Sequence, residues 1–348
     1  MKEGKQITLA LESSCDETAV ALLAEGRQVL SNVISSQIPI HQAFGGVVPE
    51  IASRHHLENI NDVLQQALEE AQVELPQVDL VGVTCGPGLV GALLIGVATA
   101  KALAFVLNKP LVGVDHMMGH VAANYIQHRE LEPPFTGLIV SGGHTVLVQV
   151  VDYNRWALIG ETRDDAVGEA YDKVARILGL GYPGGPKVEE IALKGDPKKI
   201  PFKRVYLEKD SYDFSFSGIK TAVMNYVHTE QQRKNSIDVA DVAAGFQEAV
   251  LEVLVEKSIR AALEMDTGKL VLAGGVSANQ RLCHWLEQRC GEEGLRLYHP
   301  DPLLCTDNAA MIGCAAYYKF MEGKQDDLDL DAYPGLPMAY DYLQCKRS

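Results

Sequence analysis

Two histidines spaced four residues apart, His116 and His120, are the first residues in this sequence whose type and spacing indicate chemistry. Side chains at positions i and i+4 lie on one face of a helix, so both imidazoles can bind a single metal ion. A zinc-protease helix would need a glutamate directly after the first histidine as general base, but Met117 stands there. The spacing leaves two alternatives open, a metal site or two ordinary polar residues at a helix start.

A metal site needs a third ligand, and the candidate is Asp307, which follows a Pro-Leu-Leu turn and opens a predicted helix. The alternative role for this carboxylate is to cap the helix or to stabilise its dipole. Two neutral imidazoles and one carboxylate, with coordination positions left open, suit Fe(II) as well as Zn. The residues alone do not decide between these metals.

Glycine-bearing turns follow predicted strands or precede predicted helices at four places, 86–91, 141–143, 181–185 and 274–275. Such turns present backbone N–H groups at a helix N-terminus, which suits an anion. One glycine turn is usually only a tight turn. Four of them in two similar halves predict a phosphate or nucleotide cleft between two lobes.

The predicted elements that position these residues repeat in two halves. Each half opens with a hairpin of two apolar strands around a polar or glycine-bearing turn and continues with strand–turn–helix units. This order predicts an α/β fold of two duplicated lobes, as in the actin/sugar-kinase/Hsp70 superfamily, with a nucleotide and metal site between the lobes. The first half has strands at 6–12, 18–24, 79–84 and 111–114, an amphipathic helix at 49–72 and a buried apolar helix at 89–107. The second has strands at 135–140, 145–151 and 269–273 and helices at 164–178, 217–230, 238–265, 277–289 and 306–321.

The length of 348 residues predicts two or three domains. We expect an N-terminal lobe at 1–118, a C-terminal lobe at 119–322 with a basic insertion near 195–216, and a tail at 323–348 that packs back on the N-terminal lobe. No apolar run comes near the ~18 residues of a membrane span, and no secretory signal precedes the first strand. We therefore expect a cytoplasmic protein that does not bind membranes.

The composition limits how this chain can meet nucleic acid. It has 31 Lys+Arg against 46 Asp+Glu, a net charge of −15, so bulk charge cannot attract RNA and a local basic patch or helper proteins are needed. The densest basic stretch contains Lys198, Lys199, Lys203 and Arg204. It is the candidate RNA-binding segment, and a solvated loop is the alternative. The seven cysteines, which include Cys345, contain no C-x-x-C and predict buried thiols rather than disulfides.

Residues 101–121 resemble the motif of the tRNA N6-adenosine threonylcarbamoyltransferases. The likeness extends over the whole stretch and keeps Pro110, His116 and His120 in register. Members of this family were once described as O-sialoglycoprotein endopeptidases. The same family is resembled by four further segments, 11–18, 140–145, 213–220 and 273–279. The likeness covers residues 6–340, and the chain looks like the bacterial form of the family. It implies transfer of a threonylcarbamoyl group from threonylcarbamoyl-AMP to N6 of adenosine 37, in tRNAs that read codons beginning with A.

The resemblance also implies roles for particular residues. His116, His120 and Asp307 correspond to ligands of one metal ion per subunit, usually Fe(2+), with Zn possible. The residues that correspond to the substrate-binding loop and to the nucleotide contacts of the donor are Ile139, Val140, Ser141, Gly142 and Gly143, together with Asp172, Gly185, Glu189 and Asn279. Taken alone, Asp172 or Glu189 can equally be a solvated helical residue, and Asn279 can be a helix cap.

Two further residues are candidate catalytic groups. Asp16, in the first hairpin turn, can act as a general base or orient water, although Asp is also ordinary in a turn. His144, in the second hairpin turn, can hydrogen-bond the reacting carbamoyl group, and its alternative is a polar hairpin end.

The family works with a sister subunit of similar fold, a small P-loop ATPase and the synthase that supplies threonylcarbamoyl-AMP, and the resemblance implies the same partners here. The helix at 49–72 is a candidate docking face for a partner, although its apolar side also suits the core. Two rival functions are a metabolite kinase and a nucleotide-gated interaction protein of the same superfamily. Both leave the histidine pair without a role.

Overall fold

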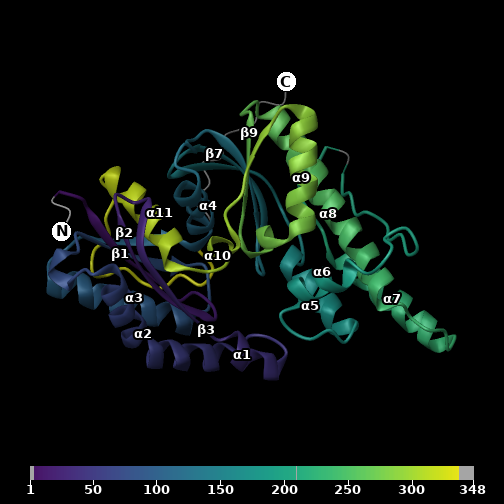
Figure 1. Cartoon of the computed structure of the whole chain (residues 1–348), viewed down its shortest axis with the longest axis horizontal. Helices are drawn as coiled ribbons and strands as arrows, with labels where there is room; N and C mark the ends of the chain where they lie inside the picture. Colours follow the sequence, from purple (N-terminus) through teal and green to yellow (C-terminus); the bar gives the residue numbers. More distant parts are fainter. Residues whose placement is uncertain (1–3, 209, 337–348) are drawn as a thin grey trace. The chain divides into compact units, whose positions relative to one another are not determined.

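The computed structural model describes residues 4–208 and 210–336, which form two compact units (Figure 1). Of the described residues, unit 1 comprises the chain up to Pro133, the short segment Asp152–Arg155 and the chain from Pro300 to Leu336. Unit 2 comprises Pro134–Val151 and Trp156–His299. Each unit has its own five-stranded sheet.

The sheet of unit 1 has the order β3-β2-β1-β4-β5, in which three antiparallel strands are followed by two parallel ones. The central strands are apolar and buried on both faces, because helices cover both sides of the sheet. The strands are β1 (Ile7–Glu12), β2 (Glu17–Ala24), β3 (Gln28–Ser36), β4 (Leu80–Gly86) and β5 (Leu111–Asp115).

Helices cover the two faces of this sheet. Successive residues of β4 show this: a Cβ on Gly82 would meet Ala316 of one helix, whereas Val83 lies against Gly96 of another. The helical segments of unit 1 are α1 (Ile38–His41), η1 (Gln42–Phe44), α2 (Pro49–Ala71), η2 (Leu75–Gln77), α3 (Val90–Leu107), α4 (His116–Gln127), α10 (Pro302–Cys305) and α11 (Ala309–Met321). Thus α3 and α11 pack on opposite faces of the sheet.

Unit 2 repeats the topology of unit 1. Its sheet has the order β8-β7-β6-β9-β10, which corresponds strand for strand to β3-β2-β1-β4-β5 of unit 1. In both sheets three antiparallel strands are followed by two parallel ones, which begin beside the first strand of the unit. Its elements are β6 (Phe135–Val140), β7 (Thr145–Asp152), β8 (Arg155–Glu161), β9 (Lys269–Ala273), β10 (Arg296–Tyr298), α5 (Val167–Ile177), α6 (Gly184–Ala192), α7 (Ser217–Gln232), α8 (Val239–Glu264), η3 (Gly275–Ala278) and α9 (Gln280–Glu293). The predicted duplicated α/β fold is therefore confirmed.

The division into units differs from the expected lobes. Residues 119–133 and 300–322 belong to unit 1, because α4 continues past residue 118 and α11 packs on the first sheet. The segment after α11 also lies on unit 1: Asp326 N–H donates to the carbonyl of Leu111 over 2.8 Å, and Tyr333 N–H donates to that of Cys85 over 2.7 Å. Residues 337–348 of the expected tail, including Cys345, lie outside the described residues.

Several element predictions need correction. Strands β3, β8 and β10 were missed. The helix predicted at 277–289 is interrupted at Asn279, and the one at 306–321 is interrupted at Asn308, because each asparagine has extended backbone angles and caps the helix that follows.

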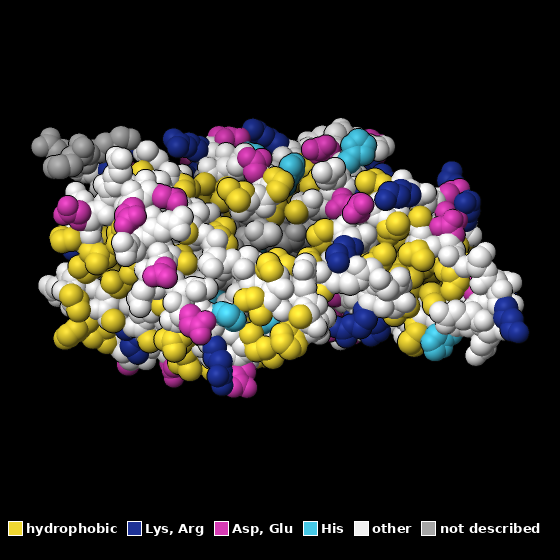
Figure 2. Space-filling view, turned by 60° about the horizontal axis from the view of Figure 1, so that its bottom comes forward, with side chains coloured by type: hydrophobic (Ala, Val, Ile, Leu, Met, Phe, Trp, Pro, Cys, Tyr) yellow, Lys and Arg dark blue, Asp and Glu magenta, His cyan; other side chains and the backbone are white. Residues whose placement is uncertain are grey.

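Helix α3 differs most from expectation. It has 18 residues and a hydropathy of 2.2, so by length and composition alone it could cross a membrane, and the prediction that no run approaches that length was wrong. Only 33% of its residues are buried in the structure, where a buried helix was predicted. Leu94, Phe105 and Val106 are exposed, and Figure 2 shows hydrophobic side chains gathered on the surface of unit 1.

The packing predicts the stability of two glycine variants. In Gly82→Ala the new Cβ would lie 2.6 Å from the Cβ of Ala316, which forces β4 and α11 apart. We expect the free energy of unfolding to fall by about 1–3 kcal/mol. The control Gly291→Ala, in α9, places its Cβ in open space and should gain about 0.5–1 kcal/mol. Urea denaturation of both variants measures this, and equal stabilities would contradict the packing.

Candidate metal and nucleotide sites

The two histidines lie in the first turns of α4, directly after β5. Asp115 caps this helix, since its carboxylate accepts from the N–H groups of Met117 over 2.8 Å and Met118 over 3.3 Å. The cap fixes the start of the helix, so that His116 and His120 share one face. The i, i+4 spacing therefore produces the predicted pair of neighbouring imidazoles, whose ring centroids are 4.6 Å apart.

Asp307 meets this pair from the connection between α10 and α11. Its Oδ1 lies 3.3 Å from Nε2 of His116 and 3.4 Å from Nε2 of His120. The alternative capping role belongs instead to Asn308, whose side chain accepts from Met311 N–H over 3.0 Å. Asp307 is therefore available as a ligand, and one potential ligand atom from each residue lies within 4.8 Å of the others.

The burial of His120 tests whether these residues fit a metal ion. Its side chain is 1% exposed, yet neither ring nitrogen makes a hydrogen bond of good geometry within the described part of the chain. A buried polar group without a partner costs free energy, so such groups are rare in folded proteins. An ion bound to Nε2 would supply the missing partner. The donor set of two imidazoles and one carboxylate fits Zn or Fe(II).

The charges of the three side chains agree with this fit. Burial alone would raise the pKa of Asp307, but the two imidazoles hold it well below its usual range. Burial would likewise lower the pKa of His116, but the carboxylates of Asp307 and Glu12 raise it. The pKa of His120 is lowered, first by burial and then by the neighbouring His116. The site therefore favours a positive charge among its three ligands.

The first hairpin turn, which carries Asp16, belongs to the same unit. Asp16 is 6% exposed, and its backbone carbonyl accepts from Gln37 N–H over 2.9 Å. The next residue, Glu17, accepts from the hydroxyl of Ser36 at Oε1 over 3.0 Å. Burial raises the pKa of Glu17 to about 9, with repulsion from Asp307 and Asp16 adding to the effect. Asp16 is therefore a buried acid beside a second carboxyl group whose pKa is raised.

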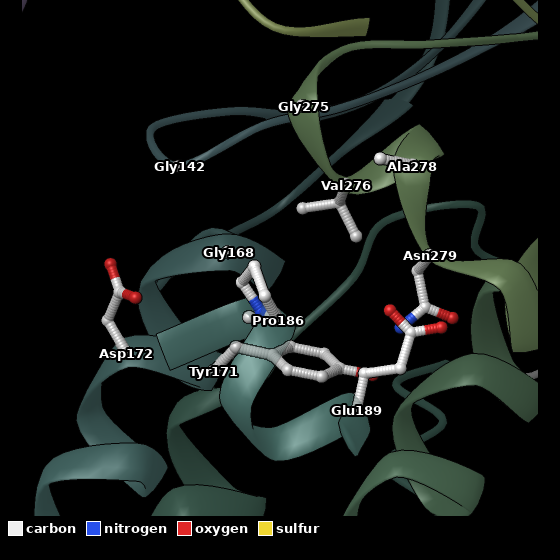
Figure 3. A pocket seen from close by; sticks show the side chains of 11 residues that line it. Gly142, Gly168, Tyr171, Asp172, Pro186, Glu189, Gly275, Val276, Ala278 and Asn279 are labelled. Atoms are coloured by element: carbon white, nitrogen blue, oxygen red, sulfur yellow. The ribbon is translucent and has the colours of Figure 1, made fainter. Parts of the chain in front are cut away.

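A separate pocket of about 360 Å³ lies in unit 2 (Figure 3). Five residues that the sequence predicts as substrate-binding line it: Gly142, Asp172, Gly185, Glu189 and Asn279. Gly168, Tyr171, Pro186, Gly275, Val276 and Ala278 complete the lining, and sequence reasoning did not select them. A Cβ added to Gly142, Gly185 or Gly275 would meet nothing within 4 Å, so the backbone at these positions is open to a ligand.

The polar side chains of the pocket are partly occupied by the protein itself. Glu189 accepts from Gln280 N–H over 2.7 Å, and Asp172 accepts from Gly184 N–H over 2.7 Å. Asn279 caps α9 through Leu282 N–H over 2.9 Å and donates to Gln247 over 3.1 Å. Each carboxylate and amide still has hydrogen-bonding capacity left. In Figure 3, Glu189 and Asn279 point toward one another and Asp172 lies apart from them.

The other predicted loop residues do not line this pocket. Ile139 and Val140 are buried in β6. Ser141 is buried too, and its hydroxyl accepts from His144 N–H over 3.1 Å. Gly143 is exposed next to Gly142. The structure therefore brings one residue of the 139–143 loop to the pocket, and the rest support the turn that presents it.

The predicted basic residues form a less positive surface than their sequence suggests. Lys199 pairs with Asp241 over 2.9 Å, and Arg204 pairs with Glu252 over 2.8 Å. Lys198 and Lys203 are exposed and have no ion-pair partner among the described residues. Two of the four charges are thus neutralised within unit 2.

Comparison with known proteins identifies the family. The family model described as tRNA N6-adenosine threonylcarbamoyltransferase matches residues 28–314. A curated relative of that description from Clostridioides difficile (strain 630) is 54% identical over 95% of this chain and 98% of its own length. Another from Clostridium botulinum (strain Hall) is 52% identical over 97% and 99%. The chain belongs to the tRNA N6-adenosine threonylcarbamoyltransferase family. The predicted family and its enzyme class, a transferase, are confirmed, and nothing favours the kinase alternative.

Solved structures support the fold of this chain. Full-length HypF in its phosphate- and nucleotide-bound form matches 92% of the chain with a TM-score of 0.64 at 15% identity, and the chain spans 47% of HypF. The activator of 2-hydroxyisocaproyl-CoA dehydratase from Clostridium difficile, with bound ADPNP, matches 93% with a TM-score of 0.51 at 13% identity. These likenesses show the fold alone, and it agrees with the predicted fold of two duplicated α/β lobes.

The triad predicts how metal content responds to substitution. Purified protein should hold about one transition-metal ion per chain, because three ligands from one site bind one ion. Replacing both His116 and His120 by alanine should remove it, since only Asp307 would remain. Elemental analysis by mass spectrometry measures the content. The control His299→Ala changes a histidine of unit 2 and should keep the ion, and metal retained by the double variant would refute the assignment.

Proposed function

We propose that this protein transfers the threonylcarbamoyl group from threonylcarbamoyl-AMP to N6 of adenosine 37 in tRNAs that read codons beginning with A. The observation that carries the proposal is the convergence of His116, His120 and Asp307 in a chain of this family. A kinase or an interaction protein of the same fold would have no use for these ligands.

The pocket of unit 2 is the proposed site for the nucleotide part of the donor. A carboxylate can accept both hydroxyls of a ribose, and Asp172 and Glu189 offer two such groups. Asn279 has one free donor and one free acceptor for an adenine edge. The open glycines Gly142 and Gly185 allow backbone N–H groups to approach the donor closely. The pocket thereby offers polar contacts to ribose, adenine and phosphate.

The reaction joins a weak nucleophile to an activated carbonyl. N6 of adenine attacks the carbamoyl carbon, the bond from that carbon to the phosphate oxygen breaks, and AMP leaves with the electron pair while N6 loses a proton. Asp16 is the candidate acceptor for that proton, and His144 is a candidate donor to the carbamoyl oxygen. An Fe(2+) ion, or Zn, held by His116, His120 and Asp307 would supply Lewis-acid charge stabilisation.

Three protein partners are proposed: a sister subunit of similar fold, a small P-loop ATPase, and the synthase that supplies threonylcarbamoyl-AMP. The apolar surface of α3 supports the first of these, because Leu94, Phe105 and Val106 are exposed. Helix α2, the face expected from the sequence, exposes mostly polar residues, with Leu57 an exception at 63% exposure. We therefore place the sister subunit on α3. Because its substrate is tRNA, we propose that the protein acts in the cytoplasm.

The assay for this function uses threonylcarbamoyl-AMP and unmodified tRNA, with the modified nucleoside detected by mass spectrometry. Wild-type protein should form product, and more of it with the sister subunit. Gly185→Val should lower product formation by at least about 10-fold, because its side chain fills the pocket that binds the donor.

The matched control is Gly291→Val, which also adds a side chain to an open helical position but lies outside the pocket. It should keep wild-type activity. Equal activity of the two variants would show that the donor nucleotide does not bind in this pocket. If the wild-type protein forms no product with all partners present, the proposed function itself is contradicted.

The basic segment predicts a salt-dependent effect on tRNA binding. Neutralising Lys198 and Lys203, which lack ion-pair partners among the described residues, should weaken binding and reduce the slope of log affinity against log salt by about one to two. Neutralising Lys199 and Arg204 should change the slope less, because both are already paired. Filter binding over a range of salt concentrations measures both. Identical slopes in all three proteins would exclude this segment from the interface.

A further inference from the structure

We propose that Glu12 is a positioning residue of the metal site: its buried carboxylate holds the ring of His116 so that Nε2 faces the ion. This inference rests on the metal site proposed above and is independent of which group the enzyme transfers. Glu12 lies in the segment 11–18 that resembles the family, but neither the histidine-bearing stretch 101–121 nor the triad includes it, and no role was predicted for it.

Glu12 is the last residue of β1, and its carboxylate is fully buried. Oε1 accepts from Ser14 N–H over 2.5 Å. Oε2 accepts from the hydroxyl of Thr84 over 2.5 Å and lies 3.1 Å from Nδ1 of His116. A buried carboxylate is costly unless hydrogen bonds surround it. These contacts satisfy that need and fix the direction of both oxygens.

Hydrogen-bond chemistry then fixes the protonation of His116. An ionised carboxylate only accepts, so Nδ1 must carry the proton that lies between it and Glu12. The hydroxyl of Ser14, 3.2 Å from the same Nδ1, shares this donor. In a neutral imidazole the other nitrogen, Nε2, then has its lone pair free. That nitrogen lies 3.3 Å from Oδ1 of Asp307, so a second ring proton or a metal ion must lie between the two atoms, and a metal ion would take the place of that proton.

The two histidines are held differently. The Nδ1 of His116 has two polar neighbours, whereas neither nitrogen of His120 makes a hydrogen bond within the described residues. A carboxylate behind a metal-binding histidine fixes its tautomer and makes the ring a stronger ligand, and its loss costs about 10- to 100-fold in metal affinity. Glu12 must therefore act through His116 and not through His120.

The test is a titration with Co(2+), followed by the visible absorption of the bound ion. Glu12→Gln keeps the shape of the side chain but turns one oxygen into an amide donor. The amide NH2 group would then face another hydrogen-bond donor, either the N–H of Ser14 or the protonated Nδ1 of His116. We expect Co(2+) to bind about 10- to 100-fold more weakly, with a changed spectrum.

The control is Asp241→Asn in unit 2. Asp241 is also buried and accepts from a backbone N–H, that of Asp196, over 2.8 Å and from a side chain, that of Lys199, over 2.9 Å. This substitution should leave Co(2+) affinity unchanged, which separates a specific effect from the general cost of removing a buried carboxylate.

A double-mutant cycle distinguishes positioning from a purely structural role. In a His116→Ala background Glu12→Gln should cause no further loss of Co(2+) affinity, whereas in a His120→Ala background it should still weaken binding. Two results would overturn the inference. One is a Glu12→Gln variant that binds Co(2+) with wild-type affinity and spectrum. The other is a loss of Co(2+) affinity on Glu12→Gln that is as large in the His116→Ala background as in the wild type. Failure of the wild-type protein to bind Co(2+) would contradict the metal site instead.

If Glu12→Gln does not fold, the Co(2+) titration is done with Thr84→Val and Ser14→Ala instead. Thr84→Val removes a donor to Oε2, and Ser14→Ala removes the hydroxyl beside Nδ1 of His116, while both leave the carboxylate in place. Each should weaken Co(2+) binding several-fold. Wild-type affinity in both would overturn the inference.

Discussion

The site in unit 1 depends on one electrostatic constraint: two imidazoles and a carboxylate meet in a buried space where only a positive charge satisfies all three. Nε2 of His116 and Nε2 of His120 lie 3.3 Å and 3.4 Å from the same oxygen of Asp307. Removing these groups from water makes any unbalanced charge or lone pair costly. The surrounding structure must therefore hold the three ligands in fixed positions.

The sheet supplies that rigidity. Glu12 ends β1, Thr84 lies near the end of β4, and His116 follows β5, so all three come from the same edge of adjacent parallel strands. The carboxyl ends of parallel strands are the usual place for ligand sites in α/β folds. Unit 2 uses the corresponding edge of its own sheet: Gly142 follows β6, and Gly275 follows β9. One topology thus carries metal-ligating side chains in one unit and glycines that expose the backbone in the other.

The parts of the site that follow from local spacing could be predicted from the sequence. The i, i+4 histidines and the duplicated strand–turn–helix order are examples. Glu12 could not, because its bonds to Thr84 and His116 join residues 72 and 104 positions apart. In the sequence it is only the polar end of an apolar strand. The exposure of α3 could not be predicted either, since a helix that is apolar all round carries no polar stripe to mark its outer face. The missed strands β3, β8 and β10 are all edge strands, and they carry more polar residues than the central strands.

Helix α3 connects the exposed surface of unit 1 to the ligands. At its N-terminus, Leu89 N–H donates to the carbonyl of Ser14 over 2.8 Å, and the hydroxyl of Ser13 donates to the carbonyl of Ala92 over 2.9 Å. Ser14 in turn contacts Nδ1 of His116. The packing is close, because a Cβ on Gly88 would lie 2.6 Å from the carbonyl oxygen of Ser14. The helix proposed to bind a partner is therefore hydrogen-bonded to the segment that orients a metal ligand, and a shift of its first turn would move that segment with it.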